Sequence, residues 1–325
     1  MQAITVISLK AFNISDSSAN LSLGELVLIP PFDKLDGEYF NSYVAAMGGQ
    51  IGMSAFVDKW FIGNRSYIND RQEVEILHLK AKHIASQFLN CLWYVADNAC
   101  SVIEIYTYVI DGEEYVLRSS FGLGSTTADG EVPTVDFSLS DINTAASIYE
   151  KMIEINDSES RQLTIELNSF QPQALHSPYH FADQAKTNRL ERALSILTMA
   201  RTNSFIPLKI SLYMSVLECL FTTDSNETVH KVSERAAFYI GTNGQDRLMI
   251  YSLIKQAYSI RSKFFHGQAL SKKNADHLSL KTTSTKVDQL LRVILTKALI
   301  IDADFFSKKP DKFDEALNTM IFGQA

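Results

Sequence analysis

The chain has 325 residues, a formal net charge of −7 and 46% hydrophobic residues. This length suggests about two domains of ordinary size, and the apolar content excludes a wholly disordered protein. No run of about 18 apolar residues occurs, and the first residues lack the pattern of a signal peptide. The three cysteines lack the spacing of a disulfide framework or a metal site. We therefore expect a cytoplasmic protein with no metal or cofactor and no association with membranes.

The charge is unevenly distributed along the chain. Residues 1–175 hold 10 Lys and Arg against 23 Asp and Glu, a balance of −13. Residues 176–325 hold 20 Lys and Arg against 14 Asp and Glu, a balance of +6. Such an asymmetry indicates two modules with different surfaces, the second of which suits a polyanion such as a nucleic acid.

Strand patterns are confined to the N-terminal half. Runs rich in β-branched and aromatic residues cover residues 4–12, 21–29 and 161–170. Residues 101–121 place two further runs around an Asp-Gly pair at 111–112, which is typical of a β-hairpin. We expect each of these runs to form strands of a sheet.

Helices are also expected in this half. Apolar residues at helical spacing predict a helix over 71–95, and a second helix is expected over 141–155 with Asp141 as its N-cap. Residues 169–180 contain two prolines and little charge, as linkers often do. Residues 1–170 are therefore predicted to form a mixed α+β domain of unknown role, a candidate sensor or regulatory domain.

From residue 181 onward the apolar residues recur with the period of a helix. Five helices joined by short polar or Gly-containing loops are predicted, over 181–202, 206–222, 227–241, 245–266 and 274–300. A last helix over 311–321 follows Pro310. Short loops between long helices favour antiparallel neighbours, so residues 181–325 are predicted to form an all-α antiparallel helical bundle.

The helix expected over 245–266 carries the strongest signal for chemistry. Its apolar stripe ends in Phe264 and Phe265, Arg261 occupies a position within the stripe, and Gly267 suits the C′ position. A guanidinium on a packing face is costly unless it is paired or lines a cleft. His266, at the helix end, is placed to be reached by solvent. Such a pair offers a cationic fork for phosphate oxygens and a group that titrates near neutral pH.

A structural role for the same residues is the alternative. Arg261 could form a buried ion pair with Glu218 or Glu234 of a neighbouring helix. His266 could cap the last carbonyls of its helix, where cations interact favourably with the helix dipole. Spacing alone does not separate this alternative from phosphate chemistry.

Three segments resemble the HEPN superfamily, the higher eukaryotes and prokaryotes nucleotide-binding domains. Arg261–His266 fits its Arg-x(4–6)-His motif. Leu217–Phe221 is similar to the Leu-Glu-x-Leu-Phe signature of the Apea-like branch, and Ser233–Ala237 to its Glu/Arg/Ala helix. Tyr258–Gly267 is similar to the Tyr-x-x-Arg-Ser-x-x-x-His-Gly ending of that branch. The resemblance covers roughly residues 181–300.

The resemblance implies a homodimeric endoribonuclease that needs no metal. Arg261 and His266 of two copies would meet in a cleft, where the 2′-hydroxyl of RNA attacks the adjacent phosphorus. Glu218 would orient Arg261, and Ser262 and Lys263 would add phosphate contacts. Tyr258 would line the cleft or pack beside it.

The resemblance also implies a biological context and an alternative. Many such proteins are toxins or antiviral (phage) defence effectors, so an antitoxin or another regulatory partner is expected beside the RNA. Other members are non-catalytic modules that bind nucleotides, RNA or proteins. A third hypothesis is an enzyme whose site lies in the N-terminal half, and such an enzyme would retain its activity without Arg261 and His266.

Overall fold

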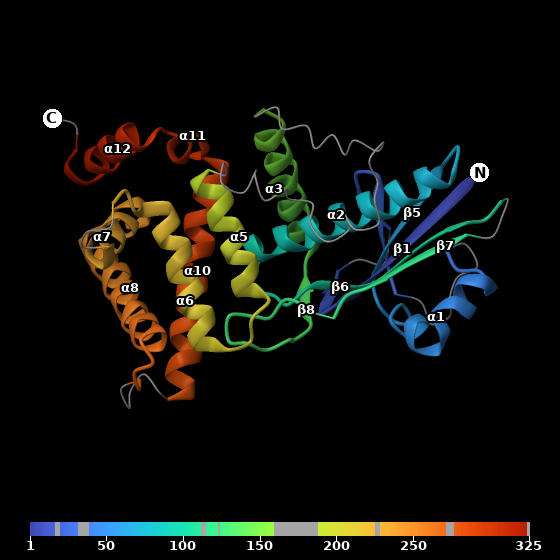
Figure 1. Cartoon of the computed structure of the whole chain (residues 1–325), viewed down its shortest axis with the longest axis horizontal. Helices are drawn as coiled ribbons and strands as arrows, with labels where there is room; N and C mark the ends of the chain where they lie inside the picture. Colours follow the sequence, from blue (N-terminus) through green and yellow to red (C-terminus); the bar gives the residue numbers. More distant parts are fainter. Residues whose placement is uncertain are drawn as a thin grey trace. The chain divides into compact units, whose positions relative to one another are not determined.

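The computed structural model describes residues 1–16, 20–31, 39–111, 115–122, 124–158, 188–224, 228–270 and 276–323. The chain divides into two compact units, Met1–Tyr149 and Glu150–Ala325 (Figure 1). The first unit is α+β and the second is helical, which confirms the class predicted for each half. The strand predicted over 161–170 and the linker predicted over 169–180 lie outside the described residues.

The first unit is built on a six-stranded sheet with the order β3-β4-β5-β1-β6-β7. Each pair of neighbours is antiparallel. Its strands are β1 (Gln2–Lys10), β3 (Leu21–Leu23), β4 (Leu26–Ile29), β5 (Phe61–Tyr67), β6 (Ser101–Val109) and β7 (Val116–Ser120). A separate parallel pair joins β2 (Phe12–Ile14) to β8 (Val135–Phe137).

The strands predicted over 4–12, 21–29 and 101–121 are confirmed with two local differences. The hairpin over 101–121 forms as expected, with β6 and β7 paired in antiparallel register. The run over 4–12 is interrupted at Ala11, whose φ of 59° lies in the left-handed region. The run over 21–29 is a hairpin rather than one strand, because the chain turns at Gly24, where φ is 65°. Strand β5 was not predicted.

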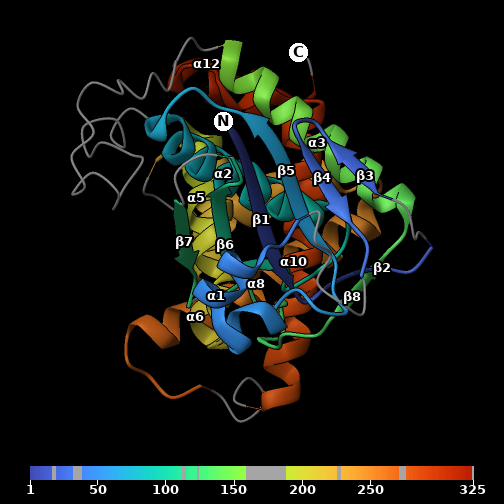
Figure 2. The same ribbon diagram turned by 90° about the vertical axis from the view of Figure 1, so that its right-hand side faces the viewer.

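The side chains on both faces of the central strands are buried, and a different helix contacts each face of the sheet (Figure 2). On β1 and β6, the side chains of Ile4, Val6, Tyr106 and Tyr108 pack in one apolar cluster with α1 (Ser42–Ser54). The alternate residues of the same strands face α2 (Arg71–Val95), which matches the helix predicted over 71–95. This period of two is what β-strand geometry requires.

The second predicted helix of this unit begins earlier than expected. Helix α3 spans Leu139–Ser158, and Ser138 rather than Asp141 is its N-cap. The Ser138 hydroxyl accepts from the Asp141 backbone N–H at 3.2 Å. The Asp141 carboxylate accepts in return from the Ser138 backbone N–H at 2.9 Å. Asp141 is therefore the reciprocal partner three residues inside a capping box, and the prediction that it is the N-cap was wrong.

The second unit consists of helices that pack around α6. They are α5 (Arg189–Arg201), α6 (Ile206–Phe221), α7 (Thr228–Ile240), α8 (Gly244–Phe265), α10 (His277–Ile300), α11 (Ala303–Phe306) and α12 (Pro310–Phe322). Helix α6 contacts α5, α7, α8 and α10. Each of the six predicted helices has a counterpart, and the short α11 is an addition. The counterpart of the helix predicted over 181–202 is α5, which begins at Arg189 with Asn188 as its N-cap, and residues 181–187 lie outside the described residues. Within the described parts of the chain, no helix combines the length and apolarity that a membrane crossing demands.

Candidate active site

Helix α8 carries the predicted catalytic pair on its last turns. Its C-terminal end is a Schellman motif, in which Gly267 adopts a φ of 64°. The Gly267 N–H donates to the Phe264 carbonyl at 3.2 Å, and the Gln268 N–H donates to the Lys263 carbonyl at 2.9 Å. The prediction of Gly267 as the C′ residue is confirmed. His266 is the C-cap of the helix and is exposed to solvent, also as predicted.

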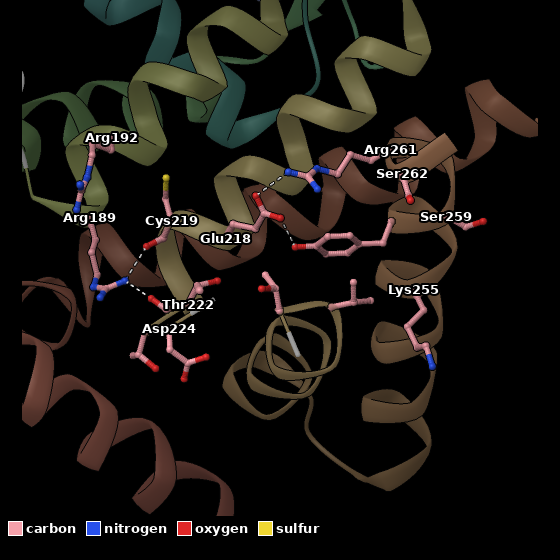
Figure 3. A pocket seen from close by; sticks show the side chains of 14 residues that line it. Arg189, Arg192, Glu218, Cys219, Thr222, Asp224, Lys255, Ser259, Arg261 and Ser262 are labelled. Carbon is pink, nitrogen blue, oxygen red and sulfur yellow. Dashed lines mark hydrogen bonds and ion pairs between the residues drawn. The ribbon is translucent and has the colours of Figure 1, made fainter. Parts of the chain in front are cut away.

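Arg261 contacts a carboxylate of α6. Its Nη2 atom donates to Oε2 of Glu218 at 3.2 Å, and the Tyr258 hydroxyl donates to Oε1 of the same carboxylate at 2.6 Å (Figure 3). Of the two carboxylates predicted as partners, Glu218 is the one in contact. The Arg261 side chain is 33% exposed, so this ion pair is not the fully buried one that a purely structural role suggested. Glu218 therefore fixes one side of a guanidinium that still faces solvent.

Tyr258 is fixed as a hydrogen-bond donor. It is only 3% exposed, and burial together with its hydrogen bond to Glu218 raises the pKa of the Tyr258 phenol well above its usual value. The hydroxyl therefore keeps its proton at neutral pH. With one carboxylate oxygen on Tyr258 and the other on Arg261, the orientation of Glu218 is set from both sides.

An open pocket of about 940 Å³ adjoins this cluster. Residues from α5, α6, α7, α8 and the α6–α7 loop line it, and Figure 3 shows their side chains. Four of its lining residues are cationic and two are anionic: Arg189, Arg192, Lys255 and Arg261 against Glu218 and Asp224. Threonine and serine hydroxyls supply further hydrogen-bonding groups at Thr222, Thr223, Thr228, Ser259 and Ser262. A cationic, hydroxyl-rich pocket is suited to an oxyanion such as a phosphate.

The four cations of the pocket are not equivalent. Arg189 donates from Nη1 to the backbone carbonyls of Cys219 at 3.1 Å and Thr222 at 2.6 Å, where α6 ends. Burial, followed by the nearby charge of Arg192, lowers the pKa of Arg189. Arg189 therefore stabilises the end of α6. Arg192 and Lys255 are exposed and can reach an incoming anion.

The pocket unites four of the six predicted site residues. Arg261, Glu218, Tyr258 and Ser262 all line it. The other two, Lys263 and His266, are not among its lining residues. Arg261 and His266 are five residues apart and so point about 140° apart around the helix axis, as expected from their spacing.

Sequence reasoning missed three further cations of the pocket, Arg189, Arg192 and Lys255. Lys255 precedes Tyr258 by three residues and Ser262 by seven, which is the spacing of one helix face. That spacing is a signal within the sequence. Arg192 belongs to α5, and only the packing of α5 on α6 brings it to the pocket.

Comparisons of this chain with protein-family models, with curated proteins and with solved structures find no match. Among the residues that the structure describes, no three His, Cys, Asp or Glu side chains are grouped so as to hold a metal ion. The function is therefore inferred from the chemistry of the pocket and its surroundings.

Proposed function

We propose that the helical unit is a HEPN-type endoribonuclease that cleaves RNA without a metal ion. One observation carries this proposal. Arg261 presents a guanidinium to a cationic pocket and is hydrogen-bonded to Glu218, which Tyr258 orients in turn. An exposed His266 lies five residues further along the same helix. These are the groups that a phosphodiester transfer requires.

The proposed reaction is an internal transesterification. The 2′-oxygen of RNA forms a bond to the adjacent phosphorus while the bond from phosphorus to the 5′-oxygen breaks, which leaves a cyclic 2′,3′-phosphate. A base removes the proton of the 2′-hydroxyl, and an acid gives a proton to the departing 5′-oxygen. His266 performs one of these transfers, because a neutral imidazole has one ring nitrogen that accepts a proton and one that donates a proton. Arg261 stabilises the negative charge that grows on the phosphoryl oxygens. DNA lacks the nucleophile and is not cleaved.

Two copies of the chain supply the complete site in this proposal. Arg261 faces the pocket, whereas His266 of the same copy is not among the pocket's lining residues. A two-fold axis through the helical units would bring the histidine of one copy toward the arginine of the other. The proposed enzyme is therefore a homodimer through this unit.

A non-catalytic binding module is the second candidate function. It is favoured by the ion pair between Arg261 and Glu218, since an Arg that stabilises the packing of α8 on α6 needs no substrate. In that case Arg261→Ala would reduce stability with no activity to lose.

Cleavage of end-labelled single-stranded RNA in chelator tests both candidates. The wild-type chain is compared with Arg261→Ala and His266→Ala, each checked for folding by circular dichroism. Lys286→Ala and His277→Ala are matched controls, since both side chains are exposed on α10 and neither lines the pocket. We expect cyclic-phosphate ends from the wild type and both controls, no cleavage by the two site variants, and no cleavage of DNA.

Equal cleavage by all five proteins would place the activity elsewhere and overturn the assignment. If RNA binds but none of the proteins cleaves it, the non-catalytic candidate is supported instead.

A further inference from the structure

An exposed aromatic cluster lies beside Arg261. Phe265, in the last turn of α8, is 57% exposed, and Phe205, the N-cap of α6, is 56% exposed. Phe264 joins them, with its ring centroid 5.7 Å from that of Phe205 and 5.4 Å from that of Phe265. The sequence pattern placed Phe265 on the packing face of its helix, and that prediction was wrong. Large apolar side chains grouped on a surface commonly mark a binding site.

The cluster is continuous with the candidate active site through Arg261. The guanidinium carbon of Arg261 lies 5.7 Å from the centroid of the Phe265 ring and also 5.7 Å from that of Tyr258. Its Nη2 atom is bound to Glu218. Arg261 therefore both lines the pocket and lies next to an exposed phenyl ring.

This arrangement matches the two parts of a nucleotide. A nucleotide carries its phosphate and its aromatic base one sugar apart, so a phosphate on Arg261 brings the neighbouring base to the Phe265 ring. Unpaired bases are commonly bound by stacking on aromatic side chains, and each base has a flat face whatever its identity.

We propose that Phe265, supported by Phe264 and Phe205, is a stacking subsite for an unpaired nucleobase next to the phosphate bound by Arg261. This inference rests on the proposed function and extends it, since it assigns single-stranded RNA as the substrate class. A base inside a duplex is already stacked on both faces, so duplex RNA does not occupy the subsite.

The size and charge of the surface favour a base over a protein partner. A stable protein interface needs about 800 Å² from each partner. Two phenylalanine side chains, each just over half exposed, offer on the order of 200 Å². That area suits one or two bases. Arg261 is next to the Phe265 ring, and the pocket that Arg261 lines also holds the cations Arg192 and Lys255, which complement the charge of an RNA backbone.

The test measures binding rather than cleavage. The probe is a fluorescein-labelled, unstructured RNA dodecamer, titrated in chelator with the His266→Ala chain so that it stays intact. A second probe is the same ribose-phosphate strand with every base removed. Phe265→Ala is added to this chain, with Phe265→Trp as the aromatic replacement. Phe322→Ala is the control, since Phe322 lies in the last turn of α12 and is 82% exposed.

We expect Phe265→Ala to weaken binding of the RNA by about 5- to 150-fold, the range measured for losing one stacked base. Phe265→Trp and Phe322→Ala should bind as tightly as the parent chain, and the abasic strand should not distinguish the variants. Equal binding of RNA by Phe265→Ala, an equal loss with the abasic strand, or no RNA binding by the parent chain would each overturn the subsite. A change from dimer to monomer on sedimentation of Phe265→Ala would show that the cluster is a subunit contact instead.

The outcome is independent of catalysis. Base-dependent binding by a wild-type chain that cleaves no RNA would retain the subsite and overturn the nuclease assignment. Cleavage of RNA by the wild-type chain, with binding that does not depend on Phe265, would retain the nuclease assignment and overturn the subsite.

Discussion

Acid should destabilise the α+β unit through one buried histidine. His78 of α2 is 5% exposed and packs against one face of the sheet. Its Nδ1 atom is 2.9 Å from the Thr107 hydroxyl, and its Nε2 atom is 2.8 Å from the Ser119 hydroxyl. Burial, together with the nearby charge of Lys82, lowers the pKa of His78 from 6.5 to about 4. The imidazole is therefore neutral in the folded chain at every pH above about 4.

The size of the effect follows from proton linkage. Between about pH 6.5 and pH 4 the unfolded chain binds a proton at His78 and the folded chain does not, so the free energy of unfolding falls as the pH falls. With these two pKa values the loss is about 2 kcal/mol at pH 5, and it approaches about 3 kcal/mol below pH 4.

Urea unfolding at pH 7 and pH 5 measures this loss. Tryptophan fluorescence follows the unfolding of the α+β unit, because both tryptophans of the chain, Trp60 and Trp93, are buried in that unit. The comparison protein is His78→Gln, which keeps hydrogen-bonding groups at this position but does not titrate. Every other titrating group is common to the two proteins. We expect the wild type to lose about 2 kcal/mol more than the variant between the two pH values. Equal losses in the two proteins would refute the assignment of a neutral, buried His78.

Three further substitutions test other parts of the structure. Gly52→Ala should destabilise the α+β unit by about 1 to 2 kcal/mol in urea unfolding, because the new Cβ atom would meet the Tyr106 hydroxyl oxygen. Adding Tyr106→Phe should cancel that loss, and additive effects of the two changes would contradict the contact. Gly267→Ala should cost about 1 kcal/mol in a thermal melt followed by circular dichroism, since φ is 64° there; no loss would contradict a left-handed C′ residue. Arg235→Met should cost about 2 kcal/mol in the same melt, because the buried guanidinium donates to the Phe221 carbonyl at 2.8 Å and to Asp314 at 2.9 Å. A loss below about 0.5 kcal/mol would show that these hydrogen bonds are not needed.

The strongly periodic segments were predictable from the sequence. Helix α2 spans the residues that its apolar period predicts, and the bounds predicted for α6, α7 and α8 are within about two residues of those observed. A long amphipathic helix can be predicted from the pattern of its own residues. No knowledge of its neighbours in space is required.

Two of the elements that were missed, β5 and α1, contain glycines that tertiary contacts require. Strand β5 includes Gly63, where an added Cβ atom would lie 2.5 Å from Ile29 and 2.7 Å from Tyr39. Helix α1 contains Gly52, which lies against Tyr106 in the same way. Glycine lowers the propensity for both strand and helix, so these segments carry weak local signals. Their structure is imposed by close packing between residues that are far apart in the sequence.

The candidate site was predictable in part for the same reason. The need of Arg261 for a carboxylate followed from a cation on an apolar helix face, but the sequence left Glu218 and Glu234 open, and the structure shows the contact with Glu218. The exposure of Phe265 could not be predicted, because the apolar period of a helix does not show at which residue its packed face ends. The pocket as a whole depends on how α5, α7 and α8 pack around α6.

The burial of basic side chains changes what the charge of the C-terminal half means for RNA binding. Three of its cations are at most 5% exposed and cannot meet a ligand: Arg201, Lys209 and Arg235. The surplus of +6 in residues 176–325 therefore overstates the charge available to an RNA backbone. If Arg192, Lys255 and Arg261 make the phosphate contacts, the logarithm of the binding constant should fall with the logarithm of salt concentration with a slope of only about −2. With that slope the affinity would fall about 16-fold between 50 and 200 mM salt, whereas a protein that makes 6 to 10 phosphate contacts loses about 10³- to 10⁵-fold over the same range.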